Sequence, residues 1–228
     1  MTLDKITIII PVLNEAKIIQ ETLLRLKNDA DVEIIVVDGG SQDNTVSLAK
    51  ALGVKVICAS AVGRANQMNM GAAAATGDIL LFLHGDTCLP KDYHTLVCEA
   101  LSQPETVAGA FELNIDSKER SLRFVEKMVN WRSHFFSLPY GDQAIFLKAY
   151  VFEEIGGFPN LPIMEDFDLI QRLKKRGKIT IVPTPVITSG RRWQKLGVFK
   201  TTLINQMIIL GYYLGISPEK LVRFYRGK

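Results

Sequence analysis

The sequence predicts an α/β fold in which a mostly parallel sheet is flanked by helices and followed by a helical tail. The first half alternates continuous runs of β-branched and aliphatic residues with segments of helical periodicity. A continuous apolar run is typical of a strand that is buried on both faces. Four strand–helix units within about eighty residues favour a parallel sheet that carries helices on both sides.

The expected strands of the first half span 6–10, 32–37, 54–57 and 79–83, and the helices 18–26, 46–52 and 65–75 alternate with them. The second half predicts helices at 91–102, 118–136, 165–176, 195–215 and 218–225, with strands at 107–115 and 179–182. We therefore expect one domain, residues 1–228, with a ligand-binding half at 1–103, a second half at 104–194 and a tail at 195–228.

Composition excludes several classes of protein. The 228 residues carry a formal charge of only +3, which does not suggest a nucleic-acid-binding protein. The three cysteines, Cys58, Cys88 and Cys98, lack metal-binding or disulfide spacing and favour the cytoplasm. Residues 1–5 show no leader pattern. The apolar stretch 203–216 is too short to span a bilayer, so a helix packed on the core is favoured over one lying on a membrane surface.

Polar residues follow three of the expected strands. Ligands of parallel sheets bind beyond the carboxyl ends of the strands, so these places are candidate binding sites. After the first strand comes PVLNE, residues 11–15, in which Asn14 could cap the next helix and Glu15 could complement its dipole, or both could bind a ligand.

The second strand ends in DGGSQDNT, residues 38–45. Glycines there allow the backbone to approach a ligand closely. Asp38 lies too far upstream to cap the following helix, so its carboxylate is expected to accept hydrogen bonds from a nucleoside base or a ribose. The fourth strand ends in HGDT, where Asp86 could hold Mg²⁺ or Mn²⁺ on phosphate oxygens, or could merely cap a turn.

In this order the segments IIIPVLNE, VVDGGSQDNT and ATGDILLFLHGDT resemble the family 2 glycosyltransferases of the GT-A fold, and the remaining motifs resemble a compact bacterial subgroup of them. The resemblance implies that residues of the first half bind a nucleotide-diphosphate sugar and that Asp86 holds a divalent metal. The residues carried over to the donor site are Pro11, Leu13, Asn14, Glu15, Asp38, Gly39, Arg64, Gln67, Asn69, Gly85 and Asp86.

Two departures from the family pattern concern the diphosphate. His84 and Gly85 stand where the metal-binding turn usually has further acids, and Met68 stands where an arginine is common. Arg64 lies one helical turn before Met68 and could reach the diphosphate instead, or it could be a solvent-exposed helix start.

The motif MEDFD follows a GGFP turn, as in the family. The resemblance assigns Asp166 as the general base that deprotonates an acceptor hydroxyl, and Glu165 as its support. A Glu–Asp pair that complements a helix dipole is the alternative.

Five more residues are expected at the acceptor or the diphosphate. Asp142 and Gln143 could bind sugar or acceptor hydroxyls or form a plain turn. SGRRW resembles a shortened family motif that lacks the usual histidine; its arginines could neutralise phosphate or form a basic surface loop. Its members in the prediction are Arg191, Arg192 and Trp193.

The resulting prediction is an inverting glycosyltransferase that uses a nucleotide-diphosphate sugar, with uridine favoured by analogy, and Mn²⁺ or Mg²⁺. A nucleotidyltransferase is disfavoured because the loop after the first strand is acidic and lacks glycine. A non-catalytic nucleotide-sugar-binding protein is the third reading. The acceptor is not identified: a lipid-linked or a small-molecule acceptor stays open, as do homodimerisation and contact with the inner face of the membrane through the C-terminal helices.

Overall fold

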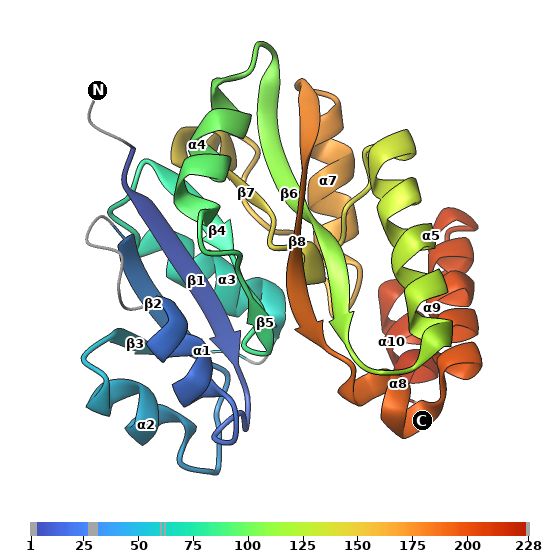
Figure 1. Ribbon diagram of the computed structural model, residues 1–228, viewed down its shortest axis with the longest axis horizontal. Coiled ribbons are helices and arrows are strands. Elements are labelled where there is room, and N and C mark those ends of the chain that lie inside the picture. The colour runs from blue at the N-terminus through green and yellow to red at the C-terminus, as the bar shows by residue number, and fades with distance from the viewer. Residues whose placement is uncertain (1–3, 27–31, 60, 62, 227–228) are drawn as a thin grey trace.

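The computed structural model describes residues 4–26, 32–59, 61 and 63–226, in which one mixed sheet carries helices on both sides (Figure 1). The first three residues, part of the segment in which no leader was expected, lie outside this part. The strands are β1 (Ile6–Val12), β2 (Val32–Asp38), β3 (Lys55–Cys58), β4 (Ile79–Phe82), β5 (Thr87–Cys88), β6 (Thr106–Asp116), β7 (Phe146–Lys148) and β8 (Lys178–Ser189). The helices are α1 (Ile19–Leu26), α2 (Thr45–Ala51), α3 (Arg64–Ala73), α4 (Tyr93–Ser102), α5 (Arg120–Phe136), α6 (Ala149–Glu154), α7 (Glu165–Lys174), α8 (Arg191–Leu196), α9 (Val198–Tyr213) and α10 (Pro218–Arg226), with a 3-10 turn at Gly141–Gln143.

The sheet is mostly parallel, as predicted, and its strand order is β3-β2-β1-β4-β7-β6-β8-β5. β1 pairs in parallel with β2 and β4, and β6 pairs in parallel with β8. The three-residue strand β7 enters between these groups and is antiparallel to both β4 and β6. So short a strand carries no periodic signal, and it was not predicted.

Side chains alternate between the two faces of the sheet. Ile8 and Ile10 point to the face covered by α1, α4 and α5, whereas Ile9 points to the face covered by α3, α6 and α7. Both faces are closed by helices, which explains why the central strands are apolar throughout. Gly71 lets α3 approach β1 closely, because a Cβ there would lie 2.4 Å from the Ile9 side chain.

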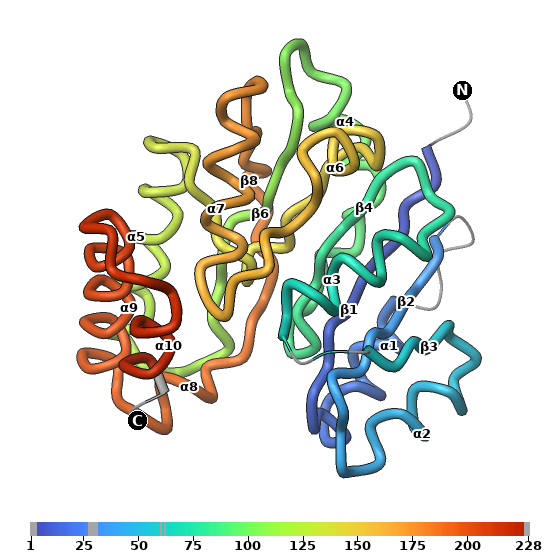
Figure 2. Tube along the Cα trace, turned by 180° about the vertical axis from the view of Figure 1, so that it is seen from behind, coloured from blue at the N-terminus to red at the C-terminus, as the bar shows by residue number. Residues whose placement is uncertain are grey.

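The helical tail folds back on the second half of the chain. The single helix expected at 195–215 is divided at Gly197, whose φ of 83° ends α8 before α9 begins. Ile208 and Leu221 then pack against Met164 and Phe167 at the start of α7, so the tail lies beside α5 and α7 (Figures 1 and 2). Among the described residues, no helix combines the length and apolarity that crossing a membrane requires.

Strand register gathers the three strand-end motifs at one edge. Val12 is paired with Asp38, and Ile9 is paired with both Ile35 and Phe82. The turn that contains Asp86 therefore begins at the same edge as the loops that follow β1 and β2. The fold thus brings together Val12, Asp38 and Asp86, which are 26 to 74 residues apart in the sequence.

Candidate functional site

The loops after β1 and β2, residues 13–18 and 39–45, are tied to each other, and we call them the strand-end loops. The Asn14 N–H donates to Ser41 Oγ, while Asn14 Oδ1 accepts from the Gln42 N–H, both at 2.8 Å. The Glu15 N–H donates to Thr45 Oγ1 at 2.8 Å. The Asn14 side chain therefore joins the two loops instead of capping α1, and its φ of 55° reflects this tight local turn.

Asp38 lies at the base of these loops with 4% of its surface exposed. Its Oδ2 accepts from the N–H groups of Gly40 and Ser41, both at 3.0 Å. As predicted, Asp38 does not cap α2. It closes its own turn, which was not predicted. Oδ1 is buried and has no hydrogen-bond partner among the described residues. A buried carboxylate oxygen rarely stays unpartnered, so Oδ1 of Asp38 has an unused capacity to accept a hydrogen bond.

Three residues predicted to bind the donor have structural roles. Gln67 is 6% exposed, and its Nε2 donates to the carbonyls of Val12 and Val37 at 2.9 and 2.7 Å, which joins β1 to β2. Asn69 exchanges two 2.9 Å hydrogen bonds with the Phe158 backbone and fixes the GGFP turn. The buried Gly85 offers its carbonyl to Thr22 Oγ1 at 2.8 Å. These contacts give Gln67, Asn69 and Gly85 structural roles, and their contact with a donor stays a prediction.

Gly39, Pro11 and Leu13 are three further residues that were predicted at the donor site. Gly39 is needed under Gln67, because a Cβ at position 39 would lie 3.1 Å from that side chain. Pro11 lines a small hollow beneath Arg64 and His84. Leu13 leaves half of its surface exposed at the edge, where a planar base could pack on it.

A cavity of about 280 Å³ lies between this edge and the tail, and we call it the carboxylate pocket. Its polar lining includes His84, Asp86, Asp142, Asp166, Arg192 and Asn205. Ile163, Phe167, Ile208 and Trp193 contribute apolar surface. A cleft with mostly apolar walls and a few convergent polar groups is the usual form of a small-molecule site.

Arg64, the first residue of α3, crosses to the start of α7. Its Nε donates to Glu165 Oε1 at 2.5 Å, and a terminal nitrogen lies 3.3 Å from His84 Nε2. Arg64 is therefore not a free helix start. Burial would lower the pKa of Arg64, but the carboxylates of Glu165 and Asp166 outweigh it and raise that pKa. Burial, with the Arg64 charge, lowers the pKa of His84 to about 4, so His84 is neutral at pH 7.

Asp166 stands at the first turn of α7 and faces the pocket. Its Oδ2 accepts from the Gly141 N–H and its Oδ1 from the Phe167 N–H, both at 2.8 Å. A side chain at Gly141 would crowd this arrangement, because a Cβ there would lie 3.1 Å from both Asp166 Oδ2 and His84 Nε2. Glu165, behind Asp166, is 2% exposed, and burial raises its pKa. The carboxylate is thus oriented by backbone and placed beside a neutral histidine and an arginine.

Asp142 and Gln143 are adjacent in the sequence but have different environments. Asp142 lines the pocket, and burial raises its pKa to about 6 despite the nearby Arg132. Gln143 is fully buried; its Nε2 donates to the Phe111 carbonyl at 2.8 Å and its Oε1 accepts from Ser133 Oγ at 2.9 Å. Gln143 therefore fixes the turn that presents Asp142, which favours the turn alternative over contact with a hydroxyl of the substrate.

Arg191 bridges two strand-end carboxylates. Its terminal nitrogens lie 3.0 and 3.2 Å from the Glu15 carboxylate and 2.9 Å from Asp86 Oδ2. Hydrogen bonding to Glu15 is the main cause that raises the pKa of Arg191. The side chains of Glu15 and Asp86 are each 24% exposed and that of Arg191 is 50% exposed, and Asp86 also lines the carboxylate pocket.

Arg192 and Trp193 extend this wall toward the tail. The Arg192 guanidinium carbon lies 3.8 Å from the ring centre of Tyr225, and both Arg192 Nε and Trp193 Nε1 are buried without a hydrogen-bond partner in the described chain. Sequence reasoning missed Tyr140, Asn205 and Tyr225, which also line the pocket. An Asn within the apolar segment was visible, but no local pattern shows which face of that helix meets a site.

The mixed sheet, its strand-end loops and the pocket beyond them are those of a GT-A glycosyltransferase fold. The model of the family Glycosyl transferase family 2 matches residues 7–152, and the chain belongs to this family. Over 237 aligned residues the chain is 27% identical to undecaprenyl-phosphate 4-deoxy-4-formamido-L-arabinose transferase of Sodalis glossinidius. The alignment covers 97% of this chain and 71% of that protein.

Two solved structures share the fold. A mannosyltransferase of Pyrobaculum calidifontis, in complex with GDP-mannose and Mn²⁺, aligns with a TM-score of 0.66 and 23% identity, covering 82% of this chain and 56% of that one. Glucosyl-3-phosphoglycerate synthase of Mycobacterium tuberculosis, in complex with Mn²⁺, uridine diphosphate and phosphoglyceric acid, aligns with a TM-score of 0.61 and 19% identity, covering 89% and 78%. The chain thus spans little more than half of the mannosyltransferase.

Proposed function

We propose that this protein is an inverting glycosyltransferase that moves a sugar from a nucleotide-diphosphate sugar to an acceptor hydroxyl, with Asp166 as the general base. The observation that carries the proposal is the Asp166 carboxylate, which is oriented by two backbone N–H groups at 2.8 Å and shares one pocket with Asp86. A base must lie within hydrogen-bond reach of the proton it removes, and a pocket wall is where an acceptor hydroxyl would lie.

The proposed reaction is a single displacement. As the acceptor oxygen bonds to the anomeric carbon, its proton passes to Asp166. The bond between that carbon and the diphosphate oxygen breaks, and its electron pair leaves with the diphosphate. Attack opposite the leaving group inverts the anomeric centre. Arg64 and Arg191 stand on the donor side of Asp166, where their positive charges would stabilise the developing charge on the diphosphate.

Nucleoside recognition falls in this proposal to the strand-end loops. The unpartnered Oδ1 of Asp38 would accept a hydrogen bond from a base N–H or a ribose hydroxyl, and Leu13 would pack against the base. Uridine is the base we favour, because the family resemblance suggests it and the Mycobacterium synthase was solved with uridine diphosphate. The acceptor, whether small or lipid-linked, would lie against Asp142, Arg192 and Trp193.

A divalent cation is part of the proposal, and the residues fit one held mainly by the donor. Within the described ranges no cluster of three or more His, Cys, Asp or Glu side chains is arranged to hold a metal. Asp86 offers one carboxylate, and Mg²⁺ is commonly bound by one or two carboxylates together with phosphate oxygens and water. Mn²⁺ or Mg²⁺ held by Asp86 would neutralise the diphosphate. Arg191, which contacts both Asp86 and Glu15, would then keep Glu15 and could also bind the phosphates.

The test is release of the nucleoside diphosphate from UDP-, GDP- and TDP-sugars, after a thermal-shift screen of the same donors with and without Mn²⁺. Asp166→Asn should lower turnover about 100-fold or more while donor-induced stabilisation stays unchanged. Asp168→Asn on the same helix is the matched control, because Asp168 pairs with Arg172 and does not line the pocket. Full turnover in Asp166→Asn would refute the assigned base.

The same assay separates the alternatives. Pyrophosphate-dependent chemistry would indicate a nucleotidyltransferase, and donor binding without turnover would indicate a binding protein.

The free state of Cys58, Cys88 and Cys98 supports a cytoplasmic location as part of the proposal.

A further inference from the structure

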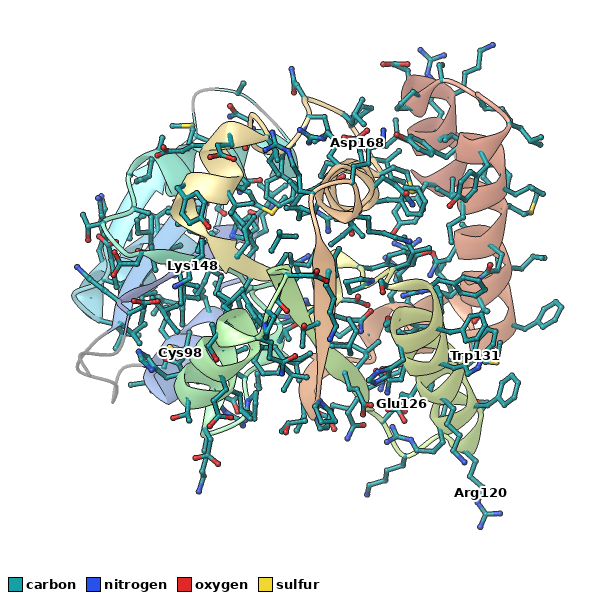
Figure 3. All side chains as sticks on the ribbon, turned by 90° about the horizontal axis from the view of Figure 1, so that it is seen from above. Cys98, Arg120, Glu126, Trp131, Lys148 and Asp168 are labelled. Atoms are coloured by element: carbon teal, nitrogen blue, oxygen red, sulfur yellow. The ribbon has the colours of Figure 1, made fainter. Side chains whose placement is uncertain are left out.

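The outer faces of α5 and α9 are apolar and exposed. On α5 the exposed large side chains that recur at helical spacing on one face are Phe124, Met128, Trp131 and Phe135. On α9 they are Phe199, Leu203, Met207, Leu210 and Tyr213, again on one face. The two helices are in contact and lie side by side in Figures 1 and 3. We call these nine residues the apolar face.

An apolar face of this kind needs a reason. Trp131 and Phe135 stack with their ring centres 5.3 Å apart, although 53% and 70% of their surfaces are exposed. Phe199 is 82% exposed. Monomeric proteins rarely expose a large contiguous apolar patch unless the patch binds a partner. The inner face of α9 is already used, because Ile208 packs on the start of α7.

Charge around the apolar face is strongly asymmetric. Segments 118–136 and 191–225, which carry the apolar face, contain eleven Lys and Arg against three Asp and Glu, a formal charge of +8. One of the eleven, Arg191, is paired with Glu15 and Asp86 outside these segments. Because the whole chain carries +3, the remaining residues carry −5. Exposed basic residues with no ion pair within the described part of the chain include Arg120, Lys127 and Lys200, and Arg120 points into solvent in Figure 3.

We propose that the apolar face and its basic surround form a docking surface for an anionic lipid bilayer. Aromatic and aliphatic side chains on one side of a helix, with Lys and Arg beside them, are the features that hold helices in the interfacial region of membranes. Anionic headgroups attract such cations, and Trp favours the headgroup level. A second copy of the chain fits less well, because an isologous contact would bring two segments of charge +8 together.

Docking in this way would orient the carboxylate pocket. Asn205 and Ile208 line the pocket from the inner side of α9, while Leu203 and Met207 lie on its outer side. One helix therefore separates the pocket from the proposed membrane contact, a distance of roughly 10 Å. The protein would rest on the bilayer without crossing it.

The experiment is flotation with phosphatidylcholine vesicles, with and without phosphatidylglycerol, at low and high salt. The wild type should float with the anionic vesicles and dissociate at high salt. Trp131→Ser combined with Phe135→Ser should weaken partitioning at least about tenfold. Arg120→Gln with Lys127→Gln should weaken it roughly fivefold per removed cation, and only on anionic vesicles at low salt.

Matched controls are exposed apolar residues on α1 and α6, outside the apolar face. Leu24→Ser on α1 and Tyr150→Ser on α6 remove similarly exposed apolar side chains, 50% and 62%, and should float like the wild type. Thermal unfolding and donor-induced stabilisation confirm that each variant is folded. Equal flotation of the face variants and the controls, or absence of wild-type flotation, would overturn the proposal. Self-association that the serine variants abolish, without vesicle binding, would assign the face to a second copy.

A spectroscopic readout uses the fact that the chain contains only two tryptophans, Trp131 and Trp193. Lipids with brominated acyl chains should quench the fluorescence of Trp131 in the wild type. Trp131→Phe keeps an apolar ring, so it should retain vesicle binding and lose most of the quenching. Unchanged quenching in this variant would contradict the assigned orientation. Because neither assay involves donor or acceptor, a negative result leaves the proposed glycosyltransferase activity standing.

Discussion

The strand-end loops and the carboxylate pocket lie next to each other but are built by different kinds of contact. In the loops, polar side chains form hydrogen bonds with backbone N–H groups. Asp38 accepts from its own turn, and Asn14 accepts from the neighbouring loop. In the pocket, side chains meet from distant segments, as when Arg64 pairs with Glu165, 101 residues away. The loops have a backbone frame that leaves one carboxylate oxygen free, whereas the pocket concentrates charge.

This difference shows where each region is vulnerable. A change in the loops should act through geometry and donor affinity, because hydrogen bonds hold their shape. A change in the pocket should act through electrostatics, because burial has already moved the pKa values of His84 and Asp142 to about 4 and about 6. Four substitutions, from the largest expected effect to the smallest, would break or sharpen the contrast.

Arg64→Met should have the largest effect. It leaves Glu165, which is 2% exposed, without its cation, and the expected loss of stability is about 2–3 kcal/mol. This is below the value for a fully buried pair, because Arg64 itself is 41% exposed and is screened by water. Thermal unfolding measures it. Arg25→Met, in the exposed Arg25–Glu21 pair, is the control and should cost less than about 0.5 kcal/mol. Equal losses would refute the electrostatic account of the pocket.

Gln67→Leu tests the frame of the strand-end loops. It leaves the buried carbonyls of Val12 and Val37 without their shared donor, at a cost of about 1–2 kcal/mol in unfolding free energy. Denaturant unfolding would show the loss. Gln42→Leu is a useful comparison, since the exposed Gln42 side chain donates a hydrogen bond to the Gly40 carbonyl at the surface of the loop. If Gln67→Leu were as stable as wild type, the assigned structural role would be wrong.

Asp38→Asn should act on donor affinity. The amide can still accept one hydrogen bond but loses the charge, so the donor Kd should rise about tenfold with little change in turnover at saturation. Isothermal titration with UDP measures the affinity. Asp43→Asn in the same loop is the control, because Asp43 serves Thr45 and Ala16 rather than an open site. An unchanged Kd for Asp38→Asn would remove Asp38 from the nucleoside site.

Asp142→Asn should give the smallest effect near pH 4, where both side chains are neutral in the folded protein, and the size of its effect depends on pH. Burial raises the pKa of Asp142 from 3.8 to about 6, so the folded chain holds more protons than the unfolded chain between these values. The contribution of Asp142 to stability therefore falls as pH rises from about 4 to 6. The Tm of Asp142→Asn relative to wild type should rise over this interval and stay level above it. A difference that does not change with pH would contradict the raised pKa.

The sheet and its strand-end motifs could be predicted because apolar runs and helical periodicity encode them locally. The same holds for the position of Asp166 in the first turn of α7, after the GGFP turn. The roles of Gln67, Asn69 and Gln143 could not be predicted. Amide side chains serve equally well in binding a ligand and in satisfying buried backbone, and only the packed structure shows which groups lie within reach.

From the sequence alone one can derive the parallel sheet, the edge at which its motifs meet and the residue types that suit a nucleotide-diphosphate sugar. The tertiary structure decided which charges meet: Arg191 reaches Glu15, 176 residues away, and Asp86, 105 residues away. It also decided that one face of α9 lines the pocket while the other is exposed. The physical reason is that periodicity specifies local conformation, whereas contacts between distant segments depend on how the finished elements pack.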